Sequence, residues 1–415
     1  IEWIGEISEG WEVHRMKSCI SQRDGGAWGD EATGETGDCI CLRIADFDYE
    51  HFRFTDSNNL TIRHYASPII KKLLLQKNDI LIEKSGGGEK TPVGRTVLFD
   101  KEYPALFANF MDRLRCSDFI LPQYLQYVFV TFYKNRYTQN YIKQTTGIQN
   151  LDLSSMLADE FVPVPNLNEQ KLIVCYLESK CSKIDNLLSK IRSSIEEYKK
   201  LKQAVITQAV TKGVRGEREM KDSGVDWIGE IPAEWRKTQL RHCAAIKSGI
   251  TLGKSYSKDT ILIERPYLRV ANVQGGYVDL NDLATIEVTP DEDLKYRLHS
   301  GDVLMTEGGD RDKLGRGCVW HGEIEPCLHQ NHVFAVQTNE TILLPEFLEY
   351  LTASDVGRSY FDVTAIKTTN LACTSSSKVL AFTIPLPPIE EQIEIVSFIK
   401  KRSLELNKLI MKKEL

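Results

Sequence analysis

Short apolar runs broken by turn residues fill two long stretches of the chain, and a helical pattern follows each stretch. Proline just inside an apolar-periodic run predicts helix starts at Pro122–Tyr133 and Pro345–Leu351. The Pro-rich segments Val162–Pro165 and Ile384–Pro388 predict an extended exit from each stretch, because proline cannot continue a helix. Runs of β-branched and aromatic residues between turn residues predict short strands at Cys39–Ile44, Asp79–Glu83, Thr96–Phe99, Pro266–Val270, Asp302–Met305 and Val333–Val336.

The same series of motifs occurs twice, at an offset of roughly 220 to 224 residues. The opening segment Trp3–Ile7, with Trp11 beyond it, returns as Trp227–Ile231 with Trp235. The further matches are Asn78–Leu81 with Gly301–Leu304, Val93–Arg95 with Leu314–Arg316, Asn109 with Asn331, Pro122–Leu125 with Pro345–Leu348, Asn150–Leu151 with Asn370–Leu371, and Glu169–Gln170 with Glu391–Gln392. A domain-sized period indicates a duplicated domain, so we expect two similar sites and a ligand with two similar parts.

Heptad patterns of apolar residues follow both stretches. The first continues from a capping Asn168 to about Thr211 without Pro or Gly and predicts a helix of roughly 65 Å, although Lys202 interrupts its seam. The second is shorter, and the duplication predicts more helix than the residues up to Leu415 supply. The predicted seam residues are Leu177, Ile184, Leu188, Ile191, Ile195, Tyr198 and Val205 in the first helix and Val396, Ile399, Leu406 and Ile410 in the second.

These patterns predict an α+β fold with two similar mixed α/β domains. We expect globular domains at residues 1–165 and 221–388, a central helix within 166–220 and a C-terminal helix within 389–415. An antiparallel intramolecular coiled coil would relate the domains by a pseudo-two-fold axis, and such a rod could reach sites about 34 Å apart on a duplex. The alternative is that each long helix packs on its own domain.

Composition excludes several classes of protein. The net charge of −6 at first argues against nucleic-acid binding, but residues 166–220 carry 11 basic and 7 acidic groups, and the local charge of the contacting face decides phosphate binding. Ten irregularly spaced cysteines without a Cys-x-x-Cys pair argue against a disulfide framework or zinc site and favour a reducing cytoplasm. No apolar run approaches the ~18 residues of a membrane span, and the start has no signal-peptide pattern.

In their order, the motifs resemble the specificity (S, HsdS) subunit of type I restriction-modification systems. The resemblance covers almost the whole chain and rests on the Trp-Ile-Gly-Glu-Ile openings, the Gly/Asn-Asp-hydrophobic-Leu strands, Thr146–Leu151 and the Pro-x-Pro…Glu-Gln helix starts. Two features depart from the pattern: the second copy reads Thr368–Leu371 where the first has the fuller motif, and the second helix is short.

The resemblance implies two target recognition domains, each reading one half of a bipartite double-stranded DNA site, with the helices as an antiparallel spacer. It also implies partners: modification (methyltransferase) subunits, two in number, which bind S-adenosylmethionine and methylate adenine, and restriction subunits that use ATP and Mg. This chain would itself hold no cofactor or metal and have no catalytic activity. It would lie in a prokaryotic cytoplasm, off the membrane, and a homodimer of the isolated chain stays open.

The sequence contains no persuasive catalytic pattern. Ser85–Thr91 resembles a phosphate-binding loop, but Glu89 stands where glycine precedes the lysine and would repel phosphate. We interpret the carboxylates of Pro290–Lys295 as a solvated loop rather than a nuclease site, and the eight histidines form no cluster with metal-ligand spacing. Without an Asn/Asp-Pro-Pro-aromatic motif, methyl transfer would need another chain.

Two polar loops in each copy supply the candidate DNA contacts. Glycine lets backbone amides approach phosphate, cations add attraction, and Gln, Asn and Arg can pair with base edges. The candidates are Lys84, Gly86, Gly87, Lys90, Arg95, Lys143, Thr145, Thr146, Gln149 and Asn150 in the first copy and Arg311, Lys313, Arg316, Lys367, Thr368 and Asn370 in the second.

The alternative for each candidate is a turn that holds the fold together. It weighs most for Arg95 and Arg316, which occur in both copies, whereas residues that differ between the copies, such as Lys84 and Lys90, are better candidates for sequence reading. We expect the tryptophans of the opening motifs in the core. We expect Lys199, Lys200 and Lys202 to form a solvated helix face, with a phosphate or partner contact as the alternative.

The function that this pattern favours is sequence-specific DNA recognition as a non-catalytic subunit of a type I restriction-modification complex. Two other classes stay open. One is a stand-alone architectural or regulatory DNA-binding protein, and the other is a coiled-coil interaction scaffold that does not bind nucleic acid.

Overall fold

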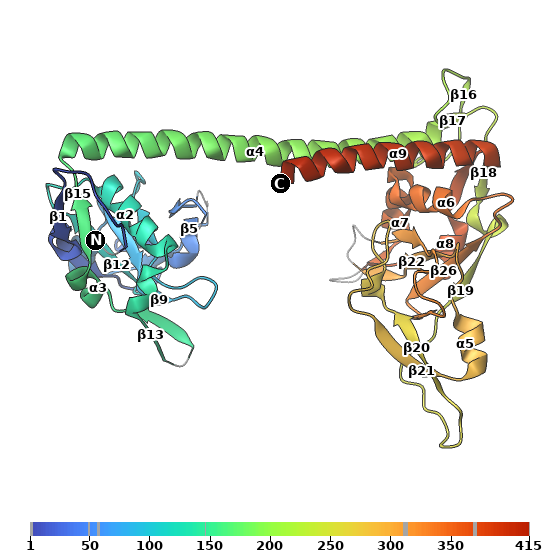
Figure 1. Cartoon of the computed structure of the whole chain (residues 1–415), viewed down its shortest axis with the longest axis horizontal. Coiled ribbons are helices and arrows are strands. Elements are labelled where there is room, and N and C mark those ends of the chain that lie inside the picture. The colour runs from blue at the N-terminus through green and yellow to red at the C-terminus, as the bar shows by residue number, and fades with distance from the viewer. Residues whose placement is uncertain are drawn as a thin grey trace. The chain divides into compact units, whose positions relative to one another are not determined.

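The computed structural model of the chain describes residues 3–48, 50–55, 59–145, 147–309, 314–367 and 372–414. It divides into two compact units, residues 1–186 (unit 1) and 187–415 (unit 2), whose sheets and helices can be followed in Figure 1. Each unit contains a four-stranded antiparallel sheet, a second sheet of four strands in unit 1 and three in unit 2, and a few short helices. The predicted α+β fold with two similar mixed domains is confirmed.

The central strands of the main sheet of unit 1 are buried on both faces. Its strands, in spatial order, are β10 (Thr96–Leu98), β8 (Ile80–Glu83), β12 (Met111–Cys116) and β2 (Ile20–Gly25). Because side chains alternate along a strand, Ile80 and Ile82 pack with α2 (Pro122–Lys134) and α3 (Leu153–Asp159) on one face. Leu81 joins a second core on the other face. That core includes residues of the second sheet, which is formed by β11 (Ala105–Phe107), β4 (Asp38–Leu42), β7 (Ile62–His64) and β3 (Asp30–Glu31).

Unit 2 repeats this topology. Its main antiparallel sheet has the order β19 (Ala244–Ser248), β26 (Val333–Thr338), β22 (Val303–Thr306) and β24 (Gly317–Val319), matching β2, β12, β8 and β10. Its second sheet is formed by β21 (Ala284–Val288), β20 (Ile263–Leu268) and β25 (Leu328–His329). The pair β20–β25 is parallel, as is β4–β11 in unit 1. The helices α6 (Pro345–Ala353), α7 (Asp355–Thr364) and α8 (Ser376–Ala381) complete the unit.

The predicted strands and helix starts are confirmed within a few residues. The other short elements of unit 1 are β1 (Glu12–Arg15), η1 (Met16–Cys19), η2 (Ile44–Asp46), β5 (Phe47–Asp48), β6 (Arg53–Phe54), α1 (Ser67–Leu73), η3 (Tyr137–Tyr141) and β15 (Phe161–Val164). Those of unit 2 are β16 (Met220–Asp222), β17 (Glu230–Pro232), β18 (Arg236–Gln239), η4 (Leu240–His242), η5 (Val270–Asn272), α5 (Pro290–Tyr296) and β29 (Thr383–Leu386).

Two long helices leave the domains: α4 (Leu167–Lys212), which passes from unit 1 into unit 2, and α9 (Ile389–Glu414). In unit 2 they contact each other. Lys202 Nζ donates to Asn407 Oδ1 at 3.1 Å, and Lys413 Nζ lies 5.7 Å from the centroid of the Tyr198 ring. Higher numbers on α4 meet lower numbers on α9, so the helices are antiparallel, as predicted.

The predicted apolar seam is confirmed only where the helices meet. Val396 and Ile399 of α9 are buried in the core of unit 2 together with Ile206, Ala209 and Val210 of α4, which sequence reading missed, and Leu406 is also buried. Of the other predicted seam residues, Leu177, Ile191, Ile195, Tyr198, Val205 and Ile410 are half-buried. Ile184 and Leu188 are 54% and 41% exposed. The described part of α9 contacts α4 from about Tyr198 onward, so a partner for these two residues stays a prediction.

A glutamine in the first turn of each long helix, Gln170 in α4 and Gln392 in α9, makes the same hydrogen bonds in both copies. Each accepts a backbone N–H and donates to two backbone carbonyls, and both are fully buried. Gln170 accepts from Leu121 N at 2.8 Å and donates to Phe119 O at 3.1 Å and Pro165 O at 2.8 Å. Gln392 accepts from Leu344 N at 2.9 Å and donates to Ile342 O at 2.8 Å and Pro387 O at 2.9 Å.

A tryptophan completes this arrangement in each copy. Trp11 Nε1 donates to Glu169 Oε1 at 3.1 Å, and Trp235 Nε1 donates to Glu391 Oε2 at 2.9 Å. We call the sets Trp11, Glu169, Gln170 and Trp235, Glu391, Gln392 the helix anchors. They fix the start of each long helix to the domain that precedes it. The tryptophans of the opening motif, Trp3 and Trp227, pack in the two cores, as expected.

Candidate nucleic-acid interface

The two polar loops of the first copy, which the sequence presents as separate segments, form one three-stranded sheet. β9 (Ser85–Gly86) pairs with β14 (Ile148–Leu151), and β14 pairs with β13 (Ile142–Thr145). We call this the first loop sheet. The labelled β13 hairpin projects from the unit on the side away from α4 (Figure 1). The structure therefore brings the candidates Lys84–Lys90 next to the candidates Lys143–Asn150.

Exposed polar side chains line this sheet. Asn150 is exposed, and its Oδ1 accepts a 2.7 Å hydrogen bond from Ser85 Oγ, which holds the amide in one orientation. Lys143 is exposed and pairs with Asp152 at 2.8 Å. The Lys143 ammonium, with the Ser155 backbone N–H, lowers the pKa of Asp152 to about 2. Asp152 also caps α3, so Lys143 is tethered at the base of the hairpin.

The glycines shape the loop that connects β9 to the main sheet. Gly86 and Gly87 have φ angles of 119° and 60°, which disfavour residues with a side chain. A Cβ at Gly87 would lie 2.9 Å from Thr91 O and from Val93 N. Gly87 is therefore required for the turn itself, while Lys90 at its tip is exposed.

Lys84 shares a carboxylate with a residue that sequence reading did not select. Asp112, whose side chain is 3% exposed, accepts from Lys84 Nζ at 2.7 Å and from Arg23 Nε at 2.7 Å. One carboxylate between two cations leaves this point of the surface net positive. No signal in the sequence connects Arg23 with Lys84, because β2 and β8 are not neighbours in the sheet.

Two candidates have structural roles instead. Arg95 is buried and forms a two-bond ion pair with Glu83, at 2.7 and 2.8 Å. Gln149 is buried, and its Oε1 accepts from Val93 N at 3.3 Å. Both side chains are turned into the domain, so their assignment to a DNA-contacting surface is corrected. The possibility that a residue shared by both copies belongs to the scaffold is confirmed for Arg95.

A second loop sheet occupies the same place in unit 2. β23 (Gly308–Gly309) pairs with β28 (Ala372–Cys373), which pairs with β27 (Ile366–Lys367). Leu151 N donates to Lys84 O at 2.8 Å in the first copy, and Thr374 N donates to Glu307 O at 2.7 Å in the second. These bonds match Asn150–Leu151 with Cys373–Thr374. The sequence match of Asn150–Leu151 with Asn370–Leu371 was therefore wrong by three residues.

Several second-copy candidates lie outside the described residues: Arg311, Lys313, Thr368 and Asn370, together with Thr146 of the first copy. Thr145 and Lys367 are placed by their backbone, in β13 and β27. Arg316 is half-buried and follows the turn at Gly315. At the base of the second loop sheet, Glu307 pairs with His332 at 2.5 Å.

The segment Pro290–Lys295 is not the solvated loop that we expected. It belongs to α5, because Thr289 and Glu292 form a capping box at the helix start. Asp293 is buried and pairs with Arg265 at 3.1 Å. The described part of the chain contains no group of three or more metal-ligating side chains. Within the same residues, no helix combines the length and apolar character needed to cross a bilayer.

The fold and these surfaces define a class of protein: a duplicated α/β domain, each copy anchored to a long helix and each presenting a loop sheet. Residues 44–197 match the family model of the type I restriction modification DNA specificity domain. The chain is 24% identical over 336 residues to the Type I restriction enzyme EcoKI specificity subunit of Escherichia coli K12, covering 78% of this chain and 67% of that protein. It is 27% identical over 336 residues to the MjaVIII specificity subunit of Methanocaldococcus jannaschii, covering 78% and 71%.

A solved structure described as showing complex assembly and conformational transition of the type I R-M system has the same fold. It aligns with a TM-score of 0.71 at 16% identity and covers 99% of this chain and 94% of that one. The comparisons thus agree with the resemblance that the motifs indicated, to the specificity subunits of type I restriction-modification systems.

Proposed function

We propose that this chain is a specificity subunit and reads a bipartite DNA site, with residues 1–165 reading one half and residues 221–388 the other. The two loop sheets carry the proposal. Their backbones share the same pairing, but their side chains differ: Lys84 of the first copy, paired with Asp112, corresponds to Glu307 of the second, paired with His332. One backbone frame with different side chains suits two readers of different sequences.

Phosphate contacts would position each domain, and base-edge contacts would provide the specificity. In the first loop sheet, Lys90 and the Lys84–Arg23 pair are suited to phosphate, and the exposed amide of Asn150 is suited to adenine. Lys143 is suited to a phosphate or to a base edge. In the second, the candidates Arg311, Lys313, Lys367, Thr368 and Asn370 remain predictions.

The chemistry would come from other chains. Modification subunits, two per complex, would dock on the long helices and bring S-adenosylmethionine, and restriction subunits would bring the ATP- and Mg-dependent cleavage. The chain would act in the cytoplasm as the non-catalytic part of this assembly, and residues 166–220 with 389–415 would serve as its spacer.

A domain exchange tests the proposal. Residues 1–165 are replaced by the corresponding domain of a relative with a different target, and the methylated sites of the host genome are mapped. The expected result is a new sequence in one half of the motif and an unchanged other half. The reciprocal exchange of residues 221–388 serves as the matched control and should alter only the other half. A change in both halves after either exchange contradicts the assignment of one half to each domain.

A further inference from the structure

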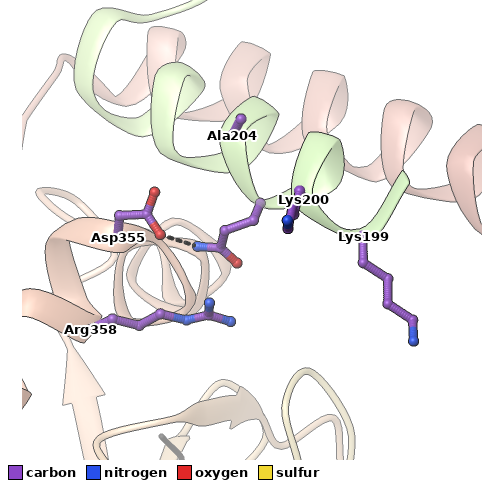
Figure 2. A pocket seen from close by; sticks show the side chains of 6 residues that line it. Lys199, Lys200, Ala204, Asp355 and Arg358 are labelled. Carbon is purple, nitrogen blue, oxygen red and sulfur yellow. Dashed lines mark hydrogen bonds between the residues drawn. The ribbon is translucent and has the colours of Figure 1, made fainter. Parts of the chain in front are cut away.

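A basic pocket of about 410 Å³ lies in unit 2 between α4 and α7 (Figure 2). Its walls are formed by Lys199, Lys200, Gln203, Ala204, Asp355 and Arg358. We infer that this pocket binds a backbone phosphate of the same DNA duplex that the second recognition domain reads. The inference rests on the proposed function and adds a contact outside both loop sheets.

The charges of the pocket favour an anion. Lys199 is partly neutralised by Glu196 at 2.8 Å, and the carboxylate of Asp355 accepts from Gln203 Nε2 at 3.1 Å. Lys200 and Arg358 are exposed, and neither forms an ion pair with any residue that the structure describes. Two cations on facing walls are therefore available to one ligand, and an arginine fork matches the geometry of phosphate oxygens.

The two walls are held at a fixed separation. Gln203 Nε2 donates to Ala353 O at 2.8 Å, which ties α4 to the end of α6. The backbone N–H of Asp355 donates to Thr207 Oγ1 at 3.0 Å, which ties the start of α7 to the next turn of α4. A ligand bridging Lys200 and Arg358 would not need to order the two helices first, so little binding energy is spent on rearrangement.

The position of the pocket favours DNA over a partner protein as the source of the phosphate-like group. α7 begins at the pocket with Asp355 and ends at Thr364, two residues before β27 of the second loop sheet. Ten helical residues span about 15 Å, which equals about four to five base pairs of duplex at ~3.4 Å each. A duplex whose bases meet the second loop sheet would therefore carry its backbone past the pocket within a few base pairs.

The test uses the full chain assembled with its modification subunits and a duplex that contains its methylation motif. Affinity is measured against salt concentration for the unaltered chain, for Lys200→Ala/Arg358→Ala, and for Lys408→Ala, which removes an exposed lysine of α9 outside the pocket. The slope of log affinity against log salt should fall by at least about 0.9 in the double variant, the value for one neutralised phosphate. It should not change in the Lys408 variant. Affinity for motif and scrambled duplexes should fall by the same factor.

A second measurement locates the phosphate. Neutral methylphosphonate linkages are placed one at a time in the five base pairs on either side of the half-site read by the second domain. The unaltered chain should lose affinity at one or two linkages, and the double variant should be insensitive at those linkages. An unchanged salt slope, equal sensitivity of both proteins, or a loss of modification-subunit capture without a change in slope would overturn the inference. Failure of the proposed function is separate, because it would show as equal binding of motif and scrambled duplexes by the unaltered chain.

Discussion

Gln170 and Gln392 each satisfy one backbone donor and two backbone acceptors where a long helix leaves its domain. Such groups are costly when they are buried without a partner. The repeated Glu-Gln pair, read from the sequence as a helix start, is therefore also the joint that holds domain and helix together. The joint is made from side chains, so its strength can be measured one residue at a time.

Replacing Gln170 by Leu should destabilise the start of α4, because Leu121 N–H and the two acceptor carbonyls lose their partner. We expect a local loss of about 1–3 kcal/mol. Amide hydrogen exchange should show faster exchange at Leu121 for this variant and at Leu344 for Gln392→Leu. Gln208→Leu, at an exposed position of α4, is the control. Unchanged exchange at both amides would mean that the anchors do not hold the helices.

Arg95→Met should destabilise unit 1 by about 3–5 kcal/mol, because the buried Glu83 loses its partner. Glu83→Leu in the same chain should restore much of that loss. Burial raises the pKa of Glu83. Arg95 lowers this pKa, so its removal leaves Glu83 in the folded variant with a still higher pKa. A carboxyl whose pKa is raised by folding destabilises the folded state at pH values above its ordinary pKa, so the loss of stability in the variant should grow as pH rises past about 4. Chemical unfolding at pH 4 and pH 7 measures this, and an equal deficit at both would argue against it.

At the scale of elements, the length of the spacer helix α4 should set the gap between the two half-sites. α4 contains 46 residues without Pro or Gly, so deleting seven residues, about two turns, shortens it by about 10 Å while nearly keeping its phase. We expect the gap between half-sites to shrink by about three base pairs. Methylation mapping with the shortened chain measures the gap. An unchanged gap would show that the length of α4 does not set the spacing of the half-sites.

The sequence predicted those elements whose buried apolar side chains produce a recognisable pattern along the chain. The strands β8 and β22 and the helices α2, α4 and α6 were found because their apolar positions repeat. The loop sheets were missed because β9 and β23 are two residues long, too short for any periodicity. Asn150–Leu151 was matched with Asn370–Leu371 because the Asn-Leu identity there outweighed the backbone correspondence three residues later, at Cys373–Thr374. Arg23 and Arg358 were missed because their neighbours come from distant segments.

At the scale of the whole molecule, one chain carrying two different readers should leave a split signature in the genome. Methylated adenines should fall in a motif of two unlike halves separated by a fixed gap. The motif should lose its methylation when the gene for this chain is deleted and regain it when the gene is restored. Persistence of the motif after deletion would show that another chain reads it.

The twin helix anchors have a consequence for how such a protein can change. Each domain is fixed to its long helix by a tryptophan, a glutamate and a glutamine at corresponding positions, and the glutamines bond corresponding backbone groups. Genetic recombination with endpoints near these anchors would replace the domain between them and keep the contacts between the domain and its long helix. A lineage could therefore acquire a new target by importing a cassette, or by copying one half of its own gene over the other, without having to evolve a new framework.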